Sequence, residues 1–208
     1  MRALVTGSSG HLGEALVRTL RHLNHEVIGV DLLESPFTAC VGSIADRILA
    51  RSCTEGVQVV FHTATLHKPH VATHGRQAFV DTNITGTLNL LEEAVEAGVE
   101  TFVFTSTTSV FGDALIPPIG ASTAWVTEGI VPVPKNIYGV TKAAAEDLCQ
   151  LFHRNQRLAW SDQKDITRRH SPRDRTRRKE LGARRGDGMR RQSIASVGFA
   201  DVGILLVP

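Results

Sequence analysis

The sequence has little of several features, and each shortage excludes a class of protein. Only three of its 208 residues are cysteine (Cys40, Cys53 and Cys149), and no two of them form a CxxC pair. A disulfide framework is therefore not expected, and the cysteines fit buried positions in a reducing compartment. No apolar run approaches the length of a transmembrane helix, and the first residues do not form a secretory signal. We expect a cytoplasmic protein that is not inserted in a membrane.

Charge is unevenly distributed along the chain. Residues 1–156 hold 10 Lys or Arg and 15 Asp or Glu, a net charge of −5, whereas residues 157–208 hold 13 basic and 6 acidic residues, a net charge of +7. The apolar content of the whole chain, 42%, is ordinary for a globular protein. We therefore expect a folded domain over 1–156 and an atypical Arg-rich tail over 157–208.

The first region alternates short apolar runs, which predict buried strands, with apolar residues at helical spacing. This alternation is typical of βαβ units and predicts an α/β fold of the Rossmann type, a doubly wound parallel sheet with helices on both faces. Ligands of such sheets bind beyond the carboxyl ends of the strands. The strands are expected at 2–6, 26–31, 58–63 and 101–105, and the helices at 11–23, 43–52, 79–97 (ended by Gly98) and 136–154.

Three glycines stand between the first predicted strand and the first predicted helix, in the segment TGSSGHLG. Gly7 permits a tight turn, Gly10 lets the backbone approach a pyrophosphate, and Gly13 lets the helix pack on the strand. The amino end of the helix offers N–H groups and a positive dipole end to phosphates. The turn predicts a dinucleotide site with contacts from Gly7, Ser9, Gly10, His11, Leu12 and Gly13.

Asp31 ends the second predicted strand, 18 residues after Gly13. A carboxylate at this point accepts hydrogen bonds from ribose hydroxyls and repels a 2′-phosphate. No Arg or Lys that would attract such a phosphate occurs between Asp31 and Arg47. NAD is therefore favoured over NADP as the cofactor, and a solvated turn residue is the alternative interpretation of Asp31.

The chain has one tyrosine, Tyr138, and Lys142 follows it four residues later. On a helix this spacing places the phenol and the ammonium on the same face. A nearby positive charge favours the phenolate, so we expect a lowered pKa of Tyr138 and proton exchange with a substrate hydroxyl during hydride transfer. Lys142 is also expected to hold the nicotinamide ribose. A surface pair at i,i+4 spacing is the alternative interpretation.

These motifs together resemble those of the extended short-chain dehydrogenases/reductases, and specifically the NAD-dependent epimerase/dehydratase family typified by UDP-glucose 4-epimerase. The resemblance implies that the family's catalytic Ser/Thr corresponds to Thr107, whose hydroxyl would hydrogen-bond the reacting oxygen. The segments that carry the resemblance are TGSSGHLG (6–13), VFHTAT (60–65), NITGT (83–87), FTSTTSVFGD (104–113) and YGVTK (138–142).

The resemblance also implies further cofactor contacts and shows some departures. The chain has Ser43 where the family usually has an Asp beside adenine, Phe111 where the family has a tyrosine, and Thr65 where it has an alanine. None of these departures removes the expected catalytic set. The cofactor-pocket residues implied by the resemblance are Ser43, Ile44, His62, Thr63, Ala64, Asn83 and Thr105, together with Tyr138 and Lys142.

The expected function is therefore that of an NAD-dependent oxidoreductase or epimerase acting on a hydroxyl or ketone carbon of a nucleotide sugar. The alternative is a non-catalytic or truncated NAD-binding module, because the family's C-terminal substrate domain is not recognisable in the sequence. A small-molecule substrate is the expected partner and a homodimer is left open, whereas nucleic acid and membranes are not expected.

The tail does not continue the α/β pattern. Between Arg157 and Arg191 there are 11 Arg and 2 Lys with few large apolar residues, so the segment is predicted to be disordered. The strand that the family has after the Tyr/Lys helix is not recognisable either. Out-of-frame translation or truncation is favoured over a nucleic-acid-binding arm, since Trp160 and Phe199 are the only aromatic residues available to stack on bases.

Two loop features are given structural interpretations. His67, His70 and His74 lie close together, but no cysteine or carboxylate joins them and Pro69 disrupts a helix there, so no metal site is expected. Trp125 is interpreted as a loop aromatic that covers the edge of the domain.

Overall fold

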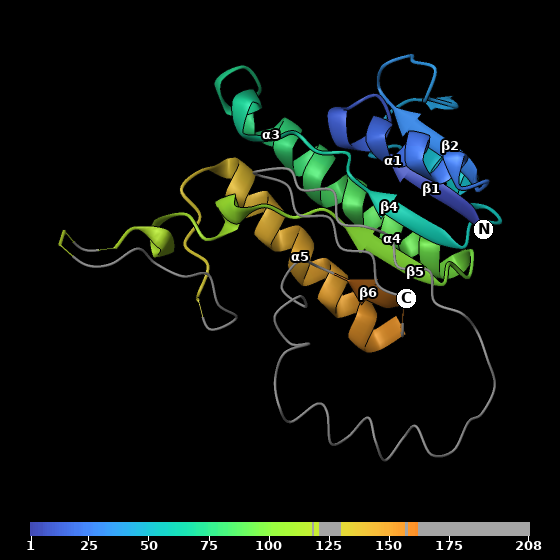
Figure 1. The fold of residues 1–208 in the computed structure, drawn as a ribbon. Coiled ribbons are helices and arrows are strands. Elements are labelled where there is room, and N and C mark those ends of the chain that lie inside the picture. The colour runs from blue at the N-terminus through green and yellow to red at the C-terminus, as the bar shows by residue number, and fades with distance from the viewer. Residues whose placement is uncertain (118, 121–129, 157, 162–208) are drawn as a thin grey trace.

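The computed structural model describes residues 1–117, 119–120, 130–156 and 158–161, which form one sheet with helices on both faces (Figure 1). The strands are β1 (Arg2–Thr6), β2 (Glu26–Asp31), β3 (Cys40–Val41), β4 (Val59–His62), β5 (Thr101–Phe104) and β6 (Ala159–Ser161). All neighbouring strands run parallel, in the order β3-β2-β1-β4-β5-β6. The strand order reverses between β1 and β4, which is the topology of a doubly wound sheet. The predicted fold class is confirmed.

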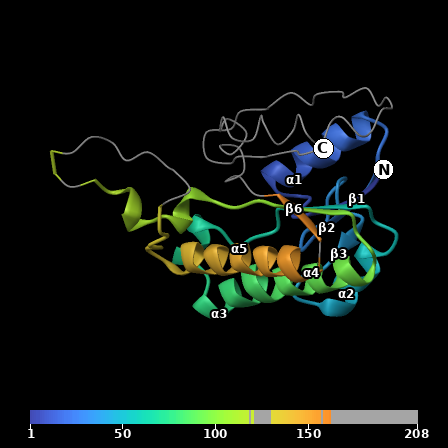
Figure 2. The ribbon, with the colours of Figure 1, turned by 90° about the horizontal axis from the view of Figure 1, so that it is seen from below.

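Helices cover both faces of the sheet, with α1 on one face and α2, α4 and α5 on the other (Figure 2). The α-helices are α1 (His11–His22), α2 (Arg47–Thr54), α3 (Arg76–Phe79), α4 (Gly86–Glu96) and α5 (Ile137–Gln156). Short 3-10 helices lie at η1 (Lys68–Ala72), η3 (Thr108–Val110) and η4 (Asp113–Leu115), and η2 (Val80–Thr85) is a π-helix.

The sheet separates two hydrophobic cores. The smaller core includes Val5 and Phe61 of the sheet and Val17 of α1, and the larger includes Phe102 of β5 and Leu91 of α4. Burying such a side chain contributes roughly 1.5–3 kcal/mol. Because strands β1, β4 and β5 are covered on both faces, they contain continuous apolar runs, and this is why the sequence showed them clearly.

Several element bounds differ from the predictions for identifiable reasons. The helix expected at 43–52 begins later, because the carboxylate of Asp46 accepts hydrogen bonds from the amides of Ile48 (2.9 Å) and Leu49 (3.4 Å) and so caps α2. The helix expected over 79–97 begins earlier, at Arg76, and contains the π-helical turn η2. The helix ends at Glu96, close to the predicted stop at Gly98, whose φ is 70° and whose amide donates to the Val95 carbonyl (3.1 Å).

Strands β3 and β6 were missed. Each has only two or three residues, too few to show a hydrophobic period. The family's strand after the Tyr/Lys helix, which the sequence pattern does not reveal, is present as β6 and pairs with β5. The sheet therefore continues past residue 156, where the folded domain was expected to end. Trp125 and the tail from residue 162 onward lie outside the described residues.

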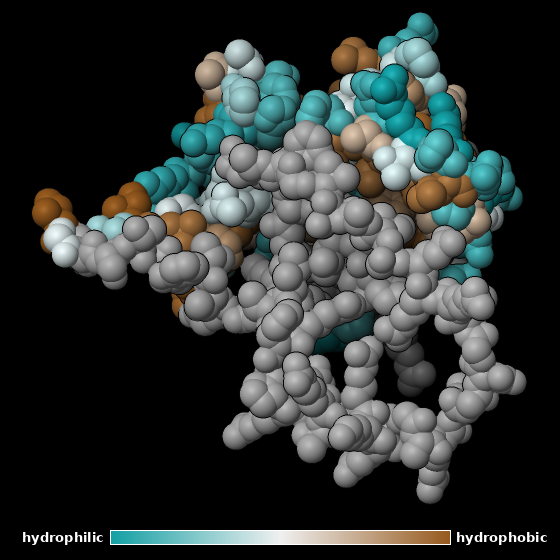
Figure 3. Space-filling model, viewed as in Figure 1, coloured by the Kyte–Doolittle hydropathy of each residue, from teal (hydrophilic) through white to brown (hydrophobic). Residues whose placement is uncertain are grey.

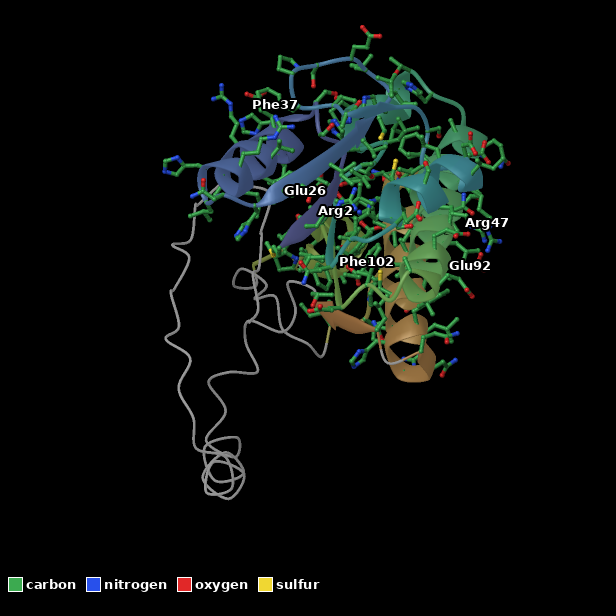
Figure 4. All side chains as sticks on the ribbon, turned by 90° about the vertical axis from the view of Figure 1, so that its right-hand side faces the viewer. Arg2, Glu26, Phe37, Arg47, Glu92 and Phe102 are labelled. Atoms are coloured by element: carbon green, nitrogen blue, oxygen red, sulfur yellow. The ribbon has the colours of Figure 1, made fainter. Side chains whose placement is uncertain are left out.

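Ion pairs join two neighbouring strands and two neighbouring helices. Arg2 and Glu26, whose side chains approach to 3.0 Å, join β1 to β2 where both strands begin, and Arg47 of α2 pairs with Glu92 of α4 at 2.8 Å (Figure 4). The buried carboxylate of Glu93 accepts from the Nε atoms of Arg47 (2.7 Å) and Arg51 (2.9 Å). The contacts of Glu92 and Glu93 therefore join α2 to α4 on one face of the sheet.

An arm, of which residues 112–117, 119–120 and 130–135 are described, extends away from the sheet (Figure 1). Its described part is held at the base by the bridge between Gly112 and Val133 and by an ion pair between Asp113 and Lys135 (2.9 Å). Ile116 and Ile119 of this arm are exposed, and apolar surface is visible on the arm at the left of Figure 3. Within the described ranges, no helix has the length and apolar character needed to cross a membrane.

Candidate functional site

The predicted site residues follow the carboxyl ends of four strands. Thr6 pairs with both Val30 and His62, and His62 pairs with Phe104, so the last residues of β1, β2, β4 and β5 lie at or near one edge of the sheet. Gly7, Asp31, Thr63 and Thr105 come at this edge. It is the position at which doubly wound sheets bind their ligands.

The glycine turn has the close backbone packing that the sequence predicted. The Gly7 amide donates to the Val30 carbonyl at 2.7 Å, and Gly7 has a φ of 72°, a value that favours glycine. A Cβ on Gly13 would lie 1.9 Å from the Gly7 carbonyl oxygen. Gly10, as the N-cap of α1, has no side chain to occupy the space in front of His11 and Leu12. The turn thus fits the pyrophosphate of a dinucleotide at the amino end of a helix.

Asp31 is oriented toward this turn. One carboxylate oxygen accepts from the Ser9 amide (2.9 Å) and the other from the Leu33 amide (3.1 Å). A carboxylate has about four acceptor positions, so these two contacts leave capacity for ribose hydroxyls. The contact with Ser9 disfavours the interpretation of Asp31 as a merely solvated turn residue.

Ser43 and Ile44 lie in the turn between β3 and α2. Ile44 is buried, and a Cβ on Gly86 would lie 2.6 Å from its side chain, so the glycine allows Ile44 to pack closely on α4. The Ile44 carbonyl accepts from Nδ2 of Asn89 (3.2 Å), and the Ser43 hydroxyl accepts from the Ala45 amide (3.1 Å). These contacts fix the backbone on the side where the family resemblance places adenine.

His62 is buried within a directional hydrogen-bond chain. The Thr87 hydroxyl donates to the Asn83 carbonyl (2.7 Å), so it accepts from Nε2 of His62 (3.0 Å). At the other end the Thr6 hydroxyl accepts from the Ala64 amide (3.2 Å) and donates to Nδ1 of His62 (2.7 Å). The imidazole therefore carries its proton on Nε2 and is neutral. Burial, reinforced by the charge of Lys142, lowers the pKa of His62 to about 3.

Asn83, in the π-helical turn η2, continues this chain to α5. Its Nδ2 donates to the Leu66 carbonyl and to the Thr141 hydroxyl, both at 3.0 Å, while its Oδ1 accepts from the Leu66 amide (2.9 Å). The hydroxyl of Thr65, which replaces the family's alanine, lies 3.0 Å from the same Oδ1. Asn83 therefore fastens the loop after β4 to the helix that carries Tyr138 and Lys142, and the sequence showed no sign of Thr141 in this role.

Thr63 and Ala64 pack against the glycine turn. The Thr63 hydroxyl donates to the Thr6 carbonyl (2.7 Å), and a Cβ on Gly7 would lie 2.8 Å from the Ala64 nitrogen. These two residues, expected in the cofactor pocket, therefore lie directly beside the glycine turn.

Lys142 is buried under the carboxyl end of β5. Its Nζ donates to the Thr105 carbonyl and lies 3.8 Å from the centre of the Phe104 ring, a cation–π contact. Burial lowers the pKa of Lys142 to about 7, although Cys149 and Glu146 act in the opposite direction. An ammonium with this pKa is partly deprotonated at neutral pH.

Tyr138 and Thr107 come together as expected, but the electrostatics differ from the prediction. Burial raises the pKa of Tyr138, and a side-chain hydrogen bond with Thr107 opposes this effect. The prediction that Lys142 lowers the pKa of Tyr138 is wrong here, because the ammonium of Lys142 is directed at the Thr105 carbonyl. The Thr107 hydroxyl also accepts from the Ser109 amide (3.2 Å), which orients it.

The three histidines of the loop after β4 are engaged with one another. The His67 amide donates to Nδ1 of His70 (3.0 Å), and the ring centres of His70 and His74 are 5.0 Å apart. Burial and the neighbouring histidines lower the pKa of His70. Within the described residues no group of His, Cys, Asp and Glu side chains is arranged to hold a metal ion.

Comparison with known proteins assigns the chain to a family. The sequence model of the NAD dependent epimerase/dehydratase family matches residues 3–160. The chain belongs to this family. NAD is the cofactor of the family, and the match includes the glycine turn, Asp31, Thr107 and the Tyr138–Lys142 pair.

Individual relatives of the chain differ in what their names describe. The uncharacterized UDP-glucose epimerase YtcB of Bacillus subtilis is 33% identical over 174 residues, 73% of this chain and 52% of that protein. The 3-beta-hydroxysteroid dehydrogenase of Mycolicibacterium neoaurum is 36% identical over 119 residues, 52% of this chain and 32% of that protein. The structure of MoeE5 in complex with UDP-glucose and NAD has a TM-score of 0.64 and 30% identity, covering 77% of this chain and 52% of that one. The chain thus spans about half the length of such relatives or less.

Proposed function

We propose that the chain binds NAD along the carboxyl edge of its sheet and acts on a hydroxyl-bearing carbon of a nucleotide sugar. The observation that carries this proposal is the meeting of two groups of residues at one edge, the glycine turn with Asp31 and the Tyr138–Thr107 pair beside Lys142. NAD is the family's cofactor, and MoeE5, which shares 30% identity, is solved with UDP-glucose and NAD.

The glycine turn is proposed to hold the pyrophosphate and Asp31 the adenosine ribose. The amino end of α1 supplies donors and a positive dipole end. Thr63 and Ala64 support the turn from the side of β4. Ser9, His11 and Leu12 are proposed to contact the dinucleotide from the same turn, and Ser43 and Ile44 are proposed to flank adenine.

Tyr138 is proposed as the general acid and base. When bound, NAD supplies the acceptor and donor of hydride. The phenol oxygen of Tyr138 takes the proton from the substrate hydroxyl and returns it, while the Thr107 hydroxyl orients the reacting oxygen. Lys142 is proposed to hold the nicotinamide ribose, and the hydrogen bond with Thr107 opposes the rise in the pKa of Tyr138 that burial causes. Asn83 of η2 positions α5 through Thr141, and Thr105, directly after β5, positions Lys142.

A second candidate is an NAD-binding module without turnover. It is favoured by the observation that the chain spans 52% of YtcB and 32% of the hydroxysteroid dehydrogenase. The experiment that separates the two candidates measures NAD affinity by calorimetry and, independently, turnover of UDP-glucose, UDP-galactose and a 3-beta-hydroxysteroid. Sugar turnover is expected under our proposal, binding without any turnover supports the second candidate, and steroid turnover alone contradicts the sugar assignment.

A further inference from the structure

Three consecutive residues after β5 each contact a different residue of α5. The Thr105 carbonyl accepts from Nζ of Lys142, the Ser106 hydroxyl donates to Oε1 of Glu146, and Thr107 hydrogen-bonds with Tyr138. The three α5 residues are four apart in sequence and so occupy one face of the helix. The middle contact, between Ser106 and Glu146, has no part in the function proposed above.

Glu146 is an unusual residue to find at this depth. Its exposed fraction is 4%, and those of Ser106 and Lys142 are 7% and 3%. A carboxylate removed from water is costly unless it is paired and hydrogen-bonded. Glu146 receives the Ser106 hydroxyl and lies close enough to Lys142 to act on its charge. This buried carboxylate therefore lies between the two other contacts that join the segment 105–107 to α5.

We propose that Glu146 is a positioning residue for the Tyr138–Lys142 site: its carboxylate holds Ser106, and with it the segment 105–107, against α5, and keeps Lys142 charged for the cofactor. This inference rests on the proposed function for its catalytic meaning. The packing of segment 105–107 on α5 and the charge of Lys142 can be measured whether or not the proposed function holds.

The charge effect follows from the groups that surround Lys142. Burial favours the neutral amine, while the Phe104 ring and the Thr105 carbonyl contact the ammonium directly. Cys149 and then Glu146, both on α5, raise the pKa of Lys142, and His62 of β4, on which the charge of Lys142 acts, is neutral in its hydrogen-bond chain. Glu146 is therefore the group in this set that supplies a carboxylate to stabilise the ammonium.

The test compares Glu146→Gln with Asp147→Asn in the full chain. Both variants remove one negative charge from the same helix, but Asp147 is exposed. The glutamine keeps the size of the side chain and can still accept from Ser106. The probe is the Cε signal of Lys142 in chain labelled with ¹³C-lysine, followed from pH 5 to 10. Lys142→Met assigns the signal among the five lysines.

Glu146→Gln is expected to lower the titration midpoint of Lys142 by about one pH unit, and Asp147→Asn by less than about 0.2. Glu146→Asp, which keeps the charge, should restore most of the shift. The affinity for NAD in Glu146→Gln should fall about tenfold at pH 8, where the charge is lost, and less than twofold at pH 5.5. A merely structural role would weaken binding equally at both values.

Ser106→Ala tests the other half of the proposal, the holding of segment 105–107, and keeps that half testable if Glu146→Gln does not fold. It keeps the carboxylate, so the Lys142 midpoint should move by less than about 0.5 unit while NAD affinity falls about fivefold at both pH values. A Lys142 midpoint unchanged in Glu146→Gln, or NAD affinity unchanged in Ser106→Ala, overturns the proposal. Wild-type chain that binds no NAD at all contradicts the proposed function instead, and the lysine titration still decides the role of Glu146.

Discussion

The two halves of the site are built in different ways. Around the glycine turn most contacts involve the backbone. The Gly7 amide donates to the Val30 carbonyl, Gly13 packs on Gly7, and Asp31 accepts from the Ser9 amide. Around α5 the contacts are made by buried side chains, among them Lys142 and Glu146. The half around the glycine turn depends on close backbone packing, whereas the half around α5 depends on the protonation of buried side chains. The two halves should therefore respond differently to substitution and to pH.

Tyr138→Phe should have the largest effect, and this effect should be limited to the half of the site around α5. The phenylalanine keeps the ring in place but removes the proton donor, so turnover should fall about 10²–10⁴-fold. NAD affinity should change less than about twofold, because the glycine turn and Asp31 are untouched. Steady-state rates on the best nucleotide sugar and calorimetric NAD titration provide the two readouts. An equal loss of turnover and of NAD affinity would contradict the proposed role of Tyr138.

Gly13→Val should have the next largest effect, limited to the half of the site around the glycine turn. A Cβ at this position would lie 1.9 Å from the Gly7 carbonyl, so the turn must move. We expect NAD affinity to fall by about 100-fold or more and the free energy of unfolding to fall by about 3 kcal/mol. Gly75→Val is the matched control, since nothing lies within 4 Å of a Cβ at Gly75. Similar NAD affinities in the two variants would show that the turn does not contact the cofactor.

His62→Gln tests the buried hydrogen bonds of His62 through the pH dependence of the free energy of unfolding. The pKa of His62 is about 3 in the folded chain, against an ordinary value near 6.5, so the unfolded chain binds the extra proton first. The stability contributed by neutral His62 is complete above about pH 6.5 and is lost as the pH falls toward 3, by up to about 1.4 kcal/mol per unit.

In His62→Gln this part of the pH dependence should disappear, and urea unfolding between pH 7 and pH 4 measures it. His25→Gln, at a partly exposed position near the N-terminal amine and away from His62, is the control and should keep the slope of the wild-type chain. A slope that persists unchanged in His62→Gln would contradict the neutral hydrogen-bond chain.

Asp31→Asn should have the smallest effect of the four. The amide keeps an acceptor for the Ser9 amide but loses the charge that favours ribose hydroxyls and repels a 2′-phosphate. NAD affinity should fall about tenfold while the affinity for NADP rises or stays constant. Parallel calorimetric titrations with both dinucleotides measure the ratio. A parallel fall for both cofactors would remove Asp31 from the discrimination between them.

The same contrast explains how much the sequence predicted. Glycine spacing and apolar periods are local signals, so the sheet, the turn and the register of Tyr138 with Lys142 were predictable. The chain through His62 and the pair of Ser106 with Glu146 join residues 56 and 40 positions apart, and no local pattern encodes such a contact. The direction of the pKa of Tyr138 was predicted wrongly for the same reason: it depends on where the buried Lys142 ammonium points.

Binding of NAD to the full chain is the measurement that tests the account most directly. Calorimetric titration of the wild-type protein at pH 7.5 should give one site per chain with a dissociation constant on the order of micromolar, weakened about 100-fold in Gly13→Val and unchanged in Tyr138→Phe. Folded wild-type protein that releases no binding heat with millimolar NAD, or affinity that survives Gly13→Val, would contradict it.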